Sequence, residues 1–527
     1  MRQENYSFER YCSREKGSAQ WADPEEIKNA PTIVRCNIEE EICNGSGLPV
    51  MCDKRDGKLV FMDNSDTHSL FWGSTGSKKT RLFGMPLINF FALAGESFIA
   101  TDPKGELYDR TSGLVAAKCY KTVVLNLRDL FQSDLWNPLK LPYEVYHSGN
   151  KEEAVSLLND FIITLAEPQR STAKDIYFIE LSCSMALAYM LFFIDTAVPE
   201  EVSVYNFANF FASKSSPEAT DELSKYIAEG SIASVNLKGV LTNKEAKSTF
   251  GNVASGVSNM FNPFVIRKTL SQVLTGSSFD IRDIGKEKTA IYIIVPDEKT
   301  TLHFLVTAFI KQIYEALIHE AQQTECKKLP VRVNFLMDEF GNIPRIPDMA
   351  SMTTAARSRN MRFFLMVQGM HQLLNKYEKE AETIKGNCDN WVFLTSREYG
   401  LLQEISNLCG MYFYTDIDGG IEMRPLISVS DLQRLSKERG EALIIHGRNH
   451  PLITELPDID EYKFKTYPPA KAHKNTLPQI KRYDVNKVIS EITGKKRPIP
   501  FSFEGFGEER YFERSPENPT KAGAWDW

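Results

Sequence analysis

Between residues 67 and 466, short apolar stretches of strand length alternate with stretches that have the periodicity of a helix. The predicted strands are residues 69–72, 97–101, 122–127, 289–295, 331–337, 363–367, 391–395 and 443–446. This alternation is typical of an α/β fold, a mostly parallel sheet covered by helices on both faces. One helix is predicted over about residues 79–94. Another is predicted where apolar residues recur at spacings of three and four, at Leu302, Val306, Phe309, Ile313 and Leu317.

The strand pattern stops for about a hundred residues in the middle of the chain, where helical periods and polar turns dominate. We interpret this part as an all-α domain inserted into the α/β domain. The predicted organisation has five parts, which are an N-terminal segment 1–66, a nucleotide-binding domain in two parts, 67–150 and 262–466, the all-α insertion 151–261, and an extended C-terminal tail 467–527.

The composition, the net charge and the cysteine spacing argue against several classes of protein. The chain has 527 residues, of which 42% are hydrophobic, and its net charge is −7, so a broad basic surface for nucleic acid is not expected. Its nine cysteines show no CxxC spacing, which predicts a reducing compartment and neither a zinc site nor a disulfide framework. The most apolar stretch, residues 179–194, is shorter than a membrane span and carries Glu180, so we expect a buried core helix.

Residues 73–80 read GSTGSKKT, directly after an apolar strand and directly before a helix. In such a loop, backbone N–H groups and the helix N-terminus hold phosphates, a lysine reaches the β and γ oxygens, and a hydroxyl ligates Mg²⁺. Lys79 and Thr80 stand at the lysine and hydroxyl positions. The alternative is a Gly/Ser turn followed by helix-capping lysines. The predicted nucleotide-binding residues are Gly73, Thr75, Gly76, Ser77, Lys78, Lys79 and Thr80.

One position of this loop departs from the consensus G-x(4)-G-K-[ST], because Lys78 stands where a glycine is expected. Glycine tolerates a positive φ and lets the backbone press against the nucleotide, so a side chain here can strain the loop. The added positive charge could instead supplement the field that attracts phosphate.

A phosphate-binding loop needs an acidic partner at the end of a neighbouring strand. The strand 331–337 runs into Asp338 and Glu339. We expect Asp338, with Thr80, to hold Mg²⁺, and Glu339 to polarise the attacking water. The alternative is a charged pair that simply ends a strand.

Two further polar residues follow this strand. Arg357 lies on a predicted helix, and Gln368 ends the strand 363–367. An arginine that reaches a neighbouring subunit's γ-phosphate stabilises transition-state charge, and a glutamine at a strand end can sense that phosphate. Spacing alone favours a solvated helix face for Arg357 and a strand-capping role for Gln368.

Seven segments together resemble the VirD4/TraG coupling proteins of bacterial conjugation and type IV secretion. They are GSAQWADPEEI (17–27), GSTGSKKT (73–80), TDPKGELYDRTSG (101–113), NLRD…WNPL (126–139), FLMDEFGNIPRIPDM (335–349), AARSRNMRFFLMVQGMHQL (355–373) and IKGNCDNWVFL (384–394). The resemblance covers about residues 17–447, and its most specific part runs from Asp338 to Gln368.

The resemblance implies a RecA-like P-loop ATPase with an inserted all-α domain, assembled as a homo-hexameric ring. Such a protein hydrolyses Mg·ATP and delivers relaxase-bound single-stranded DNA, or protein substrates, to the channel proteins of a type IV secretion system. By position, Asp338 and Glu339 become the Walker B pair. Arg357, 19 residues after Asp338, becomes an arginine finger that works across subunits, and Gln368 matches the family's glutamine.

The sequence lacks the transmembrane helices that many members carry ahead of the motor. We therefore expect a cytoplasmic protein, peripheral at the inner face of the membrane, with either a separate anchor protein or a soluble form. The leading hypothesis is a DNA-translocating ATPase. The second, favoured by Lys78, is a non-hydrolysing, nucleotide-binding receptor for secretion substrates. A monomeric P-loop kinase is the weakest, because no acceptor-substrate site is evident in the sequence.

Overall fold

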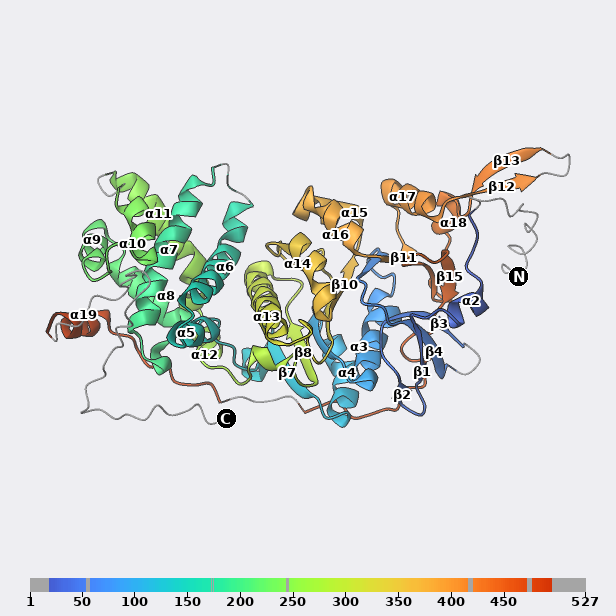
Figure 1. Cartoon of the computed structure of the whole chain (residues 1–527), viewed down its shortest axis with the longest axis horizontal. Helices are drawn as coiled ribbons and strands as arrows, with labels where there is room; N and C mark the ends of the chain where they lie inside the picture. The colour runs from blue at the N-terminus through green and yellow to red at the C-terminus, as the bar shows by residue number, and fades with distance from the viewer. Residues whose placement is uncertain are drawn as a thin grey trace.

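The computed structural model describes residues 19–53, 57–171, 173, 175–242, 246–415, 420–471 and 476–494. Its main sheet consists of β5 (Ser69–Gly73), β6 (Ser97–Asp102), β7 (Lys121–Asn126), β8 (Thr289–Ile294), β9 (Val333–Met337), β10 (Met361–Val367), β11 (Asn390–Thr395), β14 (Glu441–His446) and β15 (Leu452–Glu455). The nine strands lie in the order β15-β14-β11-β5-β10-β9-β6-β8-β7. From β11 to β7 they are parallel, and β14 and β15 add an antiparallel edge. The predicted α/β class is confirmed (Figure 1).

The sheet separates two apolar cores, because successive side chains of a strand point to opposite faces. Leu70 and Trp72 of β5 belong to one core, and Phe71 belongs to the other. The helices on the Phe71 face are α3 (Met85–Ala94) and α4 (Glu106–Ala117). The helices on the opposite face are α13 (His303–Gln323), α14 (Met349–Ala356), α15 (Met370–Tyr377), α16 (Glu380–Asn387) and α17 (Tyr399–Cys409). Fully buried strands explain why the sequence shows continuous apolar runs rather than alternation.

The described part of the N-terminal segment contains a small sheet that the sequence analysis did not predict. After the short helix α2 (Pro24–Lys28), four strands within residues 33–53 and 57–63 form an antiparallel sheet in the order β2-β1-β4-β3. Its strands are β1 (Ile33–Asn37), β2 (Ile42–Cys43), β3 (Leu48–Cys52) and β4 (Leu59–Asp63). Cys36 and Cys43 face each other across β1 and β2 and form a disulfide, a single bridge that cysteine spacing did not predict. Spacing alone did not reveal the hairpin that brings the two sulfurs together.

A helical region without strands occupies the left half of Figure 1. It extends beyond the predicted bounds of 151–261, because it begins at Lys140 and ends at Val273. Its helices are α5 (Lys140–His147), α6 (Lys151–Arg170), α7 (Tyr177–Thr196), α8 (Val204–Lys214), α9 (Pro217–Ser224), α10 (Ile232–Leu241), α11 (Lys247–Ile266) and α12 (Lys268–Val273).

Helix α7 contains the most apolar stretch of the sequence. At 20 residues it is longer than the predicted 179–194, and within the described part of the chain it alone is long and apolar enough to cross a membrane. Helices α6, α10 and α11 pack around it, and 72% of its most apolar window is buried inside the protein.

The chain after β15 is not a free tail. From the main sheet it runs beneath α4 and back to the helical region, where α19 (Val485–Gly494) docks (Figure 1). Tyr467 donates a hydrogen bond to Glu41, and Tyr483 packs edge-on against Phe193 of α7. The predicted extended tail thus contains a helix, α19, that packs on the helical region, while residues 472–475 and 495–527 lie outside the described residues.

A hairpin that the sequence did not predict projects from the α/β domain at the upper right of Figure 1. It consists of β12 (Met411–Thr415) and β13 (Ile421–Pro425), and the short helix α18 (Val429–Leu432) follows it. The side chains of β13 are mostly exposed, so no apolar run marked this strand in the sequence.

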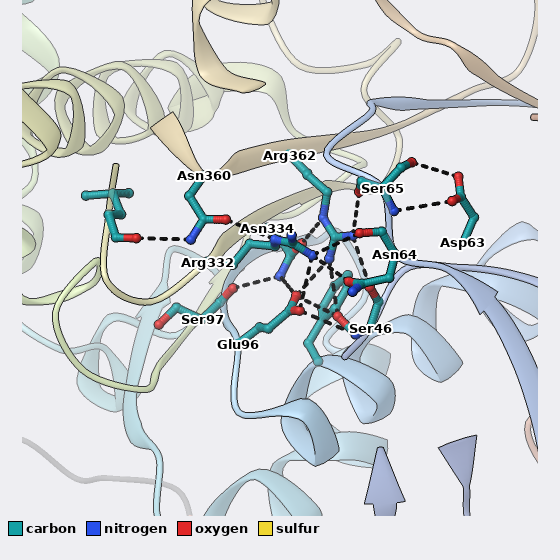
Figure 2. A network of polar contacts seen from close by, with 12 residues as sticks. Ser46, Asp63, Asn64, Ser65, Glu96, Ser97, Arg332, Asn334, Asn360 and Arg362 are labelled. Atoms are coloured by element: carbon teal, nitrogen blue, oxygen red, sulfur yellow. Dashed lines mark hydrogen bonds and ion pairs between the residues drawn. The ribbon is translucent and has the colours of Figure 1, made fainter. Parts of the chain in front are cut away.

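A buried polar network joins the small sheet to the amino-terminal edge of the main sheet (Figure 2). Arg362 at the start of β10 is 1% exposed, and its Nη2 lies 2.7 Å from Oε2 of Glu96. The same guanidinium donates to Oδ1 of Asn334 at 2.9 Å and to the carbonyl oxygens of Ser46 and Ser65 at 3.0 and 3.2 Å. Since β10 runs from this network to the opposite edge of the sheet, the network fixes the strand that carries Gln368.

Candidate nucleotide site

The loop predicted to bind phosphate lies at the carboxyl end of β5, between β10 and β11. It turns back on itself, with the N–H of Ser77 donating to the carbonyl of Ser74 at 3.0 Å and Gly76 at a φ of 77°. The helix that follows opens with a π-helical turn, Thr80–Gly84, before α3. The predicted strand–loop–helix context is therefore present, and the loop's amides lie at the amino end of a helix, where anions are favoured.

Lys78 keeps the backbone conformation of the glycine it replaces. Its φ is 66°, in the left-handed region that an L-residue enters at a cost of about 1–2 kcal/mol. Its amino group leaves the loop and lies 3.5 Å from Oδ2 of Asp458. The backbone at Lys78 thus has a conformation typical of glycine, and the lysine charge is directed toward Asp458.

Thr80 and Asp338 meet although they are far apart in the sequence. The hydroxyl of Thr80 donates to Oδ2 of Asp338 at 2.9 Å. The amino group of Lys79 donates to the carbonyl oxygen of Gly73, 2.5 Å away, inside the loop. A phosphate-loop lysine, a hydroxyl and a carboxylate therefore converge at the carboxyl edge of the parallel sheet, the usual place for ligands in α/β folds.

The Asp338 side chain is buried. Burial raises its pKa to about 6, and the charge of Glu339 also raises it, while the hydrogen bond from Thr80 and the charge of Lys79 lower it. Thr101 at the end of β6 donates to the backbone carbonyl of Asp338 at 2.8 Å, which fixes the strand tip. Burial lowers the pKa of Lys79, and the charges of Glu339 and Asp338 partly oppose that shift.

Glu339 and Gln368 also lie together. The side-chain amide of Gln368 donates to Oε2 of Glu339 at 2.8 Å, and Asn342 donates to the same oxygen at 3.1 Å. Gln372, four residues after Gln368, accepts a hydrogen bond from the backbone N–H of Gln368 at 3.0 Å, which gives the spacing of the two glutamines a structural reason. Glu339 has a φ of 52°, a strained conformation of the kind that clusters at functional sites.

Arg357 does not lie at this site. It stands in a 3₁₀ turn before β10, at the opposite edge of the sheet, and pairs with Asp389 at 3.0 Å and Asp66 at 3.3 Å. Strand β10 has seven residues, so at about 3.3 Å per residue Arg357 is more than about 20 Å from Gln368. Arg357 therefore cannot act on a nucleotide held by its own loop.

The sequence analysis did not predict two residues that lie near the loop. Asp458, which follows β15, pairs with both Lys78 and Arg81. Lys437, in the loop before β14, brings its Nζ within 3.9 Å of where a Cβ on Gly76 would stand. Neither belongs to a recognisable motif, and only the fold brings them to the loop.

The residues at this site suit a magnesium nucleotide. Thr80 and Asp338 supply hard oxygen ligands of the kind Mg²⁺ prefers, and Lys79 and the loop amides suit phosphate oxygens. The hydroxyl of Ser77 is buried and finds no hydrogen-bond partner among the described residues, so a polar group of a ligand would satisfy it.

The fold and this site define a protein with a RecA-like P-loop fold. The chain belongs to the family described as type IV secretory system conjugative DNA transfer, whose model matches residues 20–418. The resemblance to the VirD4/TraG coupling proteins is thereby confirmed.

Curated relatives agree with this family. The chain is similar to protein VirD4 of Rhizobium radiobacter, with 23% identity over 423 residues, which cover 76% of this chain and 55% of the relative. It is also similar to protein VirD4 of Agrobacterium fabrum, with 22% identity over 418 residues, which cover 76% and 57%. The chain thus spans about half the length of the curated relatives it matches.

Solved structures of the plasmid coupling protein TrwB share the fold. One, in complex with the non-hydrolysable GTP analogue GDPNP, has a TM-score of 0.56 at 15% identity and covers 87% of this chain and 97% of its own. Another, in complex with ADP and Mg²⁺, has a TM-score of 0.55 at 13% identity and covers 88% and 97%. At these identities the likeness shows the fold alone.

Proposed function

We propose that this chain is the ATP-hydrolysing motor of a type IV secretion or conjugation system. In this proposal it recruits relaxase-bound single-stranded DNA, or protein substrates, and drives them to the channel proteins. The contact between Thr80 and Asp338 at 2.9 Å carries the proposal, because it joins the two halves of a P-loop site. The TrwB structures with nucleotide and Mg²⁺ support the same ligand class.

Each residue of the site has a role in the proposed reaction. Lys79 and the loop amides bind the phosphates, and Thr80 and Asp338 hold Mg²⁺. The metal ion neutralises charge on the phosphate oxygens when it is bound. Glu339 orients and polarises the attacking water, and Gln368 holds the Glu339 carboxylate and can respond to the γ-phosphate.

We further propose that Arg357 acts in trans. It lies at the edge of the sheet remote from its own loop, is partly exposed and is held by two exposed carboxylates. A neighbouring copy of the chain would have to present its own loop to this edge, as subunits of a homo-hexameric ring can.

A non-hydrolysing, nucleotide-binding receptor is the second candidate, and the positive φ of Lys78 favours it. Steady-state ATP hydrolysis with and without single-stranded DNA separates the two. The motor predicts turnover that DNA stimulates and that Glu339→Gln abolishes, while Mg·ATP binding by the variant persists. Tight binding with no turnover in the wild type would support the receptor.

A further inference from the structure

The two consecutive lysines of the phosphate loop point in different directions. The amino group of Lys79 stays within the loop on the carbonyl of Gly73, while that of Lys78 leaves it for Asp458. The side chain of Lys78 is 30% exposed and that of Asp458 is 14% exposed. The positive charge of Lys78 therefore has a specific, largely buried counter-ion in Asp458.

Asp458 is held firmly next to the loop. Its neighbours Leu456 and Tyr462 are buried, and the N–H of Leu456 donates to the carbonyl of Gly440 at 3.0 Å. The guanidinium of Arg81 donates from Nε to Oδ2 of Asp458 at 3.0 Å. Since Arg81 lies in the first turn after the loop, this contact ties the segment after β15 to the loop itself.

Asp458 is ionised at neutral pH. Burial raises its pKa, but the hydrogen bond and charge of Arg81 and the charge of Lys78 outweigh burial, so the net shift is downward. Asp460, two residues on, pairs with Arg81 and Arg110 and makes no ion pair with Lys78. It provides a control with the same charge on the same segment, which shares Arg81 with Asp458 but pairs with Arg110 instead of Lys78.

We propose that Asp458 is a positioning residue that holds the Lys78 ammonium at the outer rim of the loop, so that a bound nucleotide meets one lysine instead of two. The inference rests on the proposed nucleotide binding. A carboxylate that neutralises a nearby cation weakens the attraction of the loop for phosphate. Its removal leaves Lys78 unpaired and free to turn toward the phosphates, so nucleotide affinity rises.

The sign of the effect separates this role from a merely structural one. If Asp458 only supported the fold of the loop, Asp458→Asn would weaken nucleotide binding. We expect it to tighten binding of Mg·ADP and of a non-hydrolysable Mg·ATP analogue by about two- to fivefold, the range of one exposed ion pair. In a Lys78→Gly background, where there is no ammonium to release, the same substitution changes the dissociation constant much less.

The experiment is a double-mutant cycle on the full chain, read by isothermal titration calorimetry. It compares the wild type, Asp458→Asn, Lys78→Gly and the double variant, with Asp458→Glu to restore wild-type affinity. Asp460→Asn is the control and should change affinity by the same factor in both backgrounds.

Two outcomes overturn the inference, namely weaker binding by Asp458→Asn, or an equal factor in the wild-type and Lys78→Gly backgrounds. A wild type that binds no nucleotide refutes the proposed function itself. Binding by the wild type without coupling between positions 78 and 458 refutes only the role of Asp458.

Discussion

The substitution Glu96→Gln tests the buried network of Figure 2. Glu96 is the carboxylate that balances Arg362, and it lies 3.5 Å from Arg332 as well. Burial lowers the pKa of Arg362 to about 10, with the charge of Glu96 opposing the shift, so the guanidinium is charged at neutral pH. The glutamine keeps the shape of the side chain and removes its charge, which leaves a cation that is 1% exposed without its counter-ion.

Removing one partner of a buried ion pair costs about 3–5 kcal/mol. We expect Glu96→Gln to lower the free energy of unfolding by that amount, a large share of the stability of an ordinary domain. Adding Arg362→Met should recover part of the loss, because no unpaired charge then remains in the interior. The corresponding coupling energy is about 2–3 kcal/mol.

Urea denaturation followed by circular dichroism measures these free energies. Glu287→Gln is the matched control, because Glu287 pairs with Lys121 at 3.1 Å but is 55% exposed, and its loss should cost less than about 1 kcal/mol. The reasoning is refuted if Glu96→Gln is no more destabilising than Glu287→Gln, or if the cycle shows no coupling.

Further predictions concern protonation and catalysis across subunits. Burial lowers the pKa of His68 to about 4, so between about pH 6.5 and 4 the unfolded chain binds a proton that the folded protein does not. The free energy of unfolding should fall over this window by up to about 3 kcal/mol, and His68→Gln should remove most of that slope in urea titrations at several pH values. Arg357→Ala should abolish ATP turnover while calorimetry still detects Mg·ATP binding, because the residue lies far from its own loop. Mixing Arg357→Ala with Lys79→Ala, each inactive alone, should restore turnover if the finger works in trans, and no recovery in mixtures that assemble would contradict that role.

Much of the main sheet could be predicted because its strands are buried on both faces. Strand β8, for instance, is buried along its whole length and appears in the sequence as an uninterrupted apolar run. The small sheet gave no such signal. In β1, Arg35 is exposed and only Cys36 is fully buried, so neither a run nor a clean alternation marks the strand.

The part of the nucleotide site that could be predicted consists of residues marked by local sequence patterns. A Gly-rich loop between a strand and a helix, and an acidic pair after a buried strand, indicated Thr80 and Asp338, which the fold brings to 2.9 Å. The sequence also showed that Lys78 departs from the consensus, but it did not show which residue pairs with it. Its partner Asp458 lies 380 residues later on a segment without a motif, and only tertiary structure shows which acidic residue fills the role.

The central claim is that the loop after β5 and the tip of β9 hold one Mg·nucleotide between them. Calorimetric titration of the full chain with a non-hydrolysable Mg·ATP analogue tests this claim most directly, for the wild type and for Lys79→Ala and Asp338→Asn. We predict one site per chain in the wild type, loss of binding in Lys79→Ala, and loss of the Mg²⁺-dependent part of the affinity in Asp338→Asn. No heat of binding in the wild type, or equal affinity in all three proteins, would contradict the account.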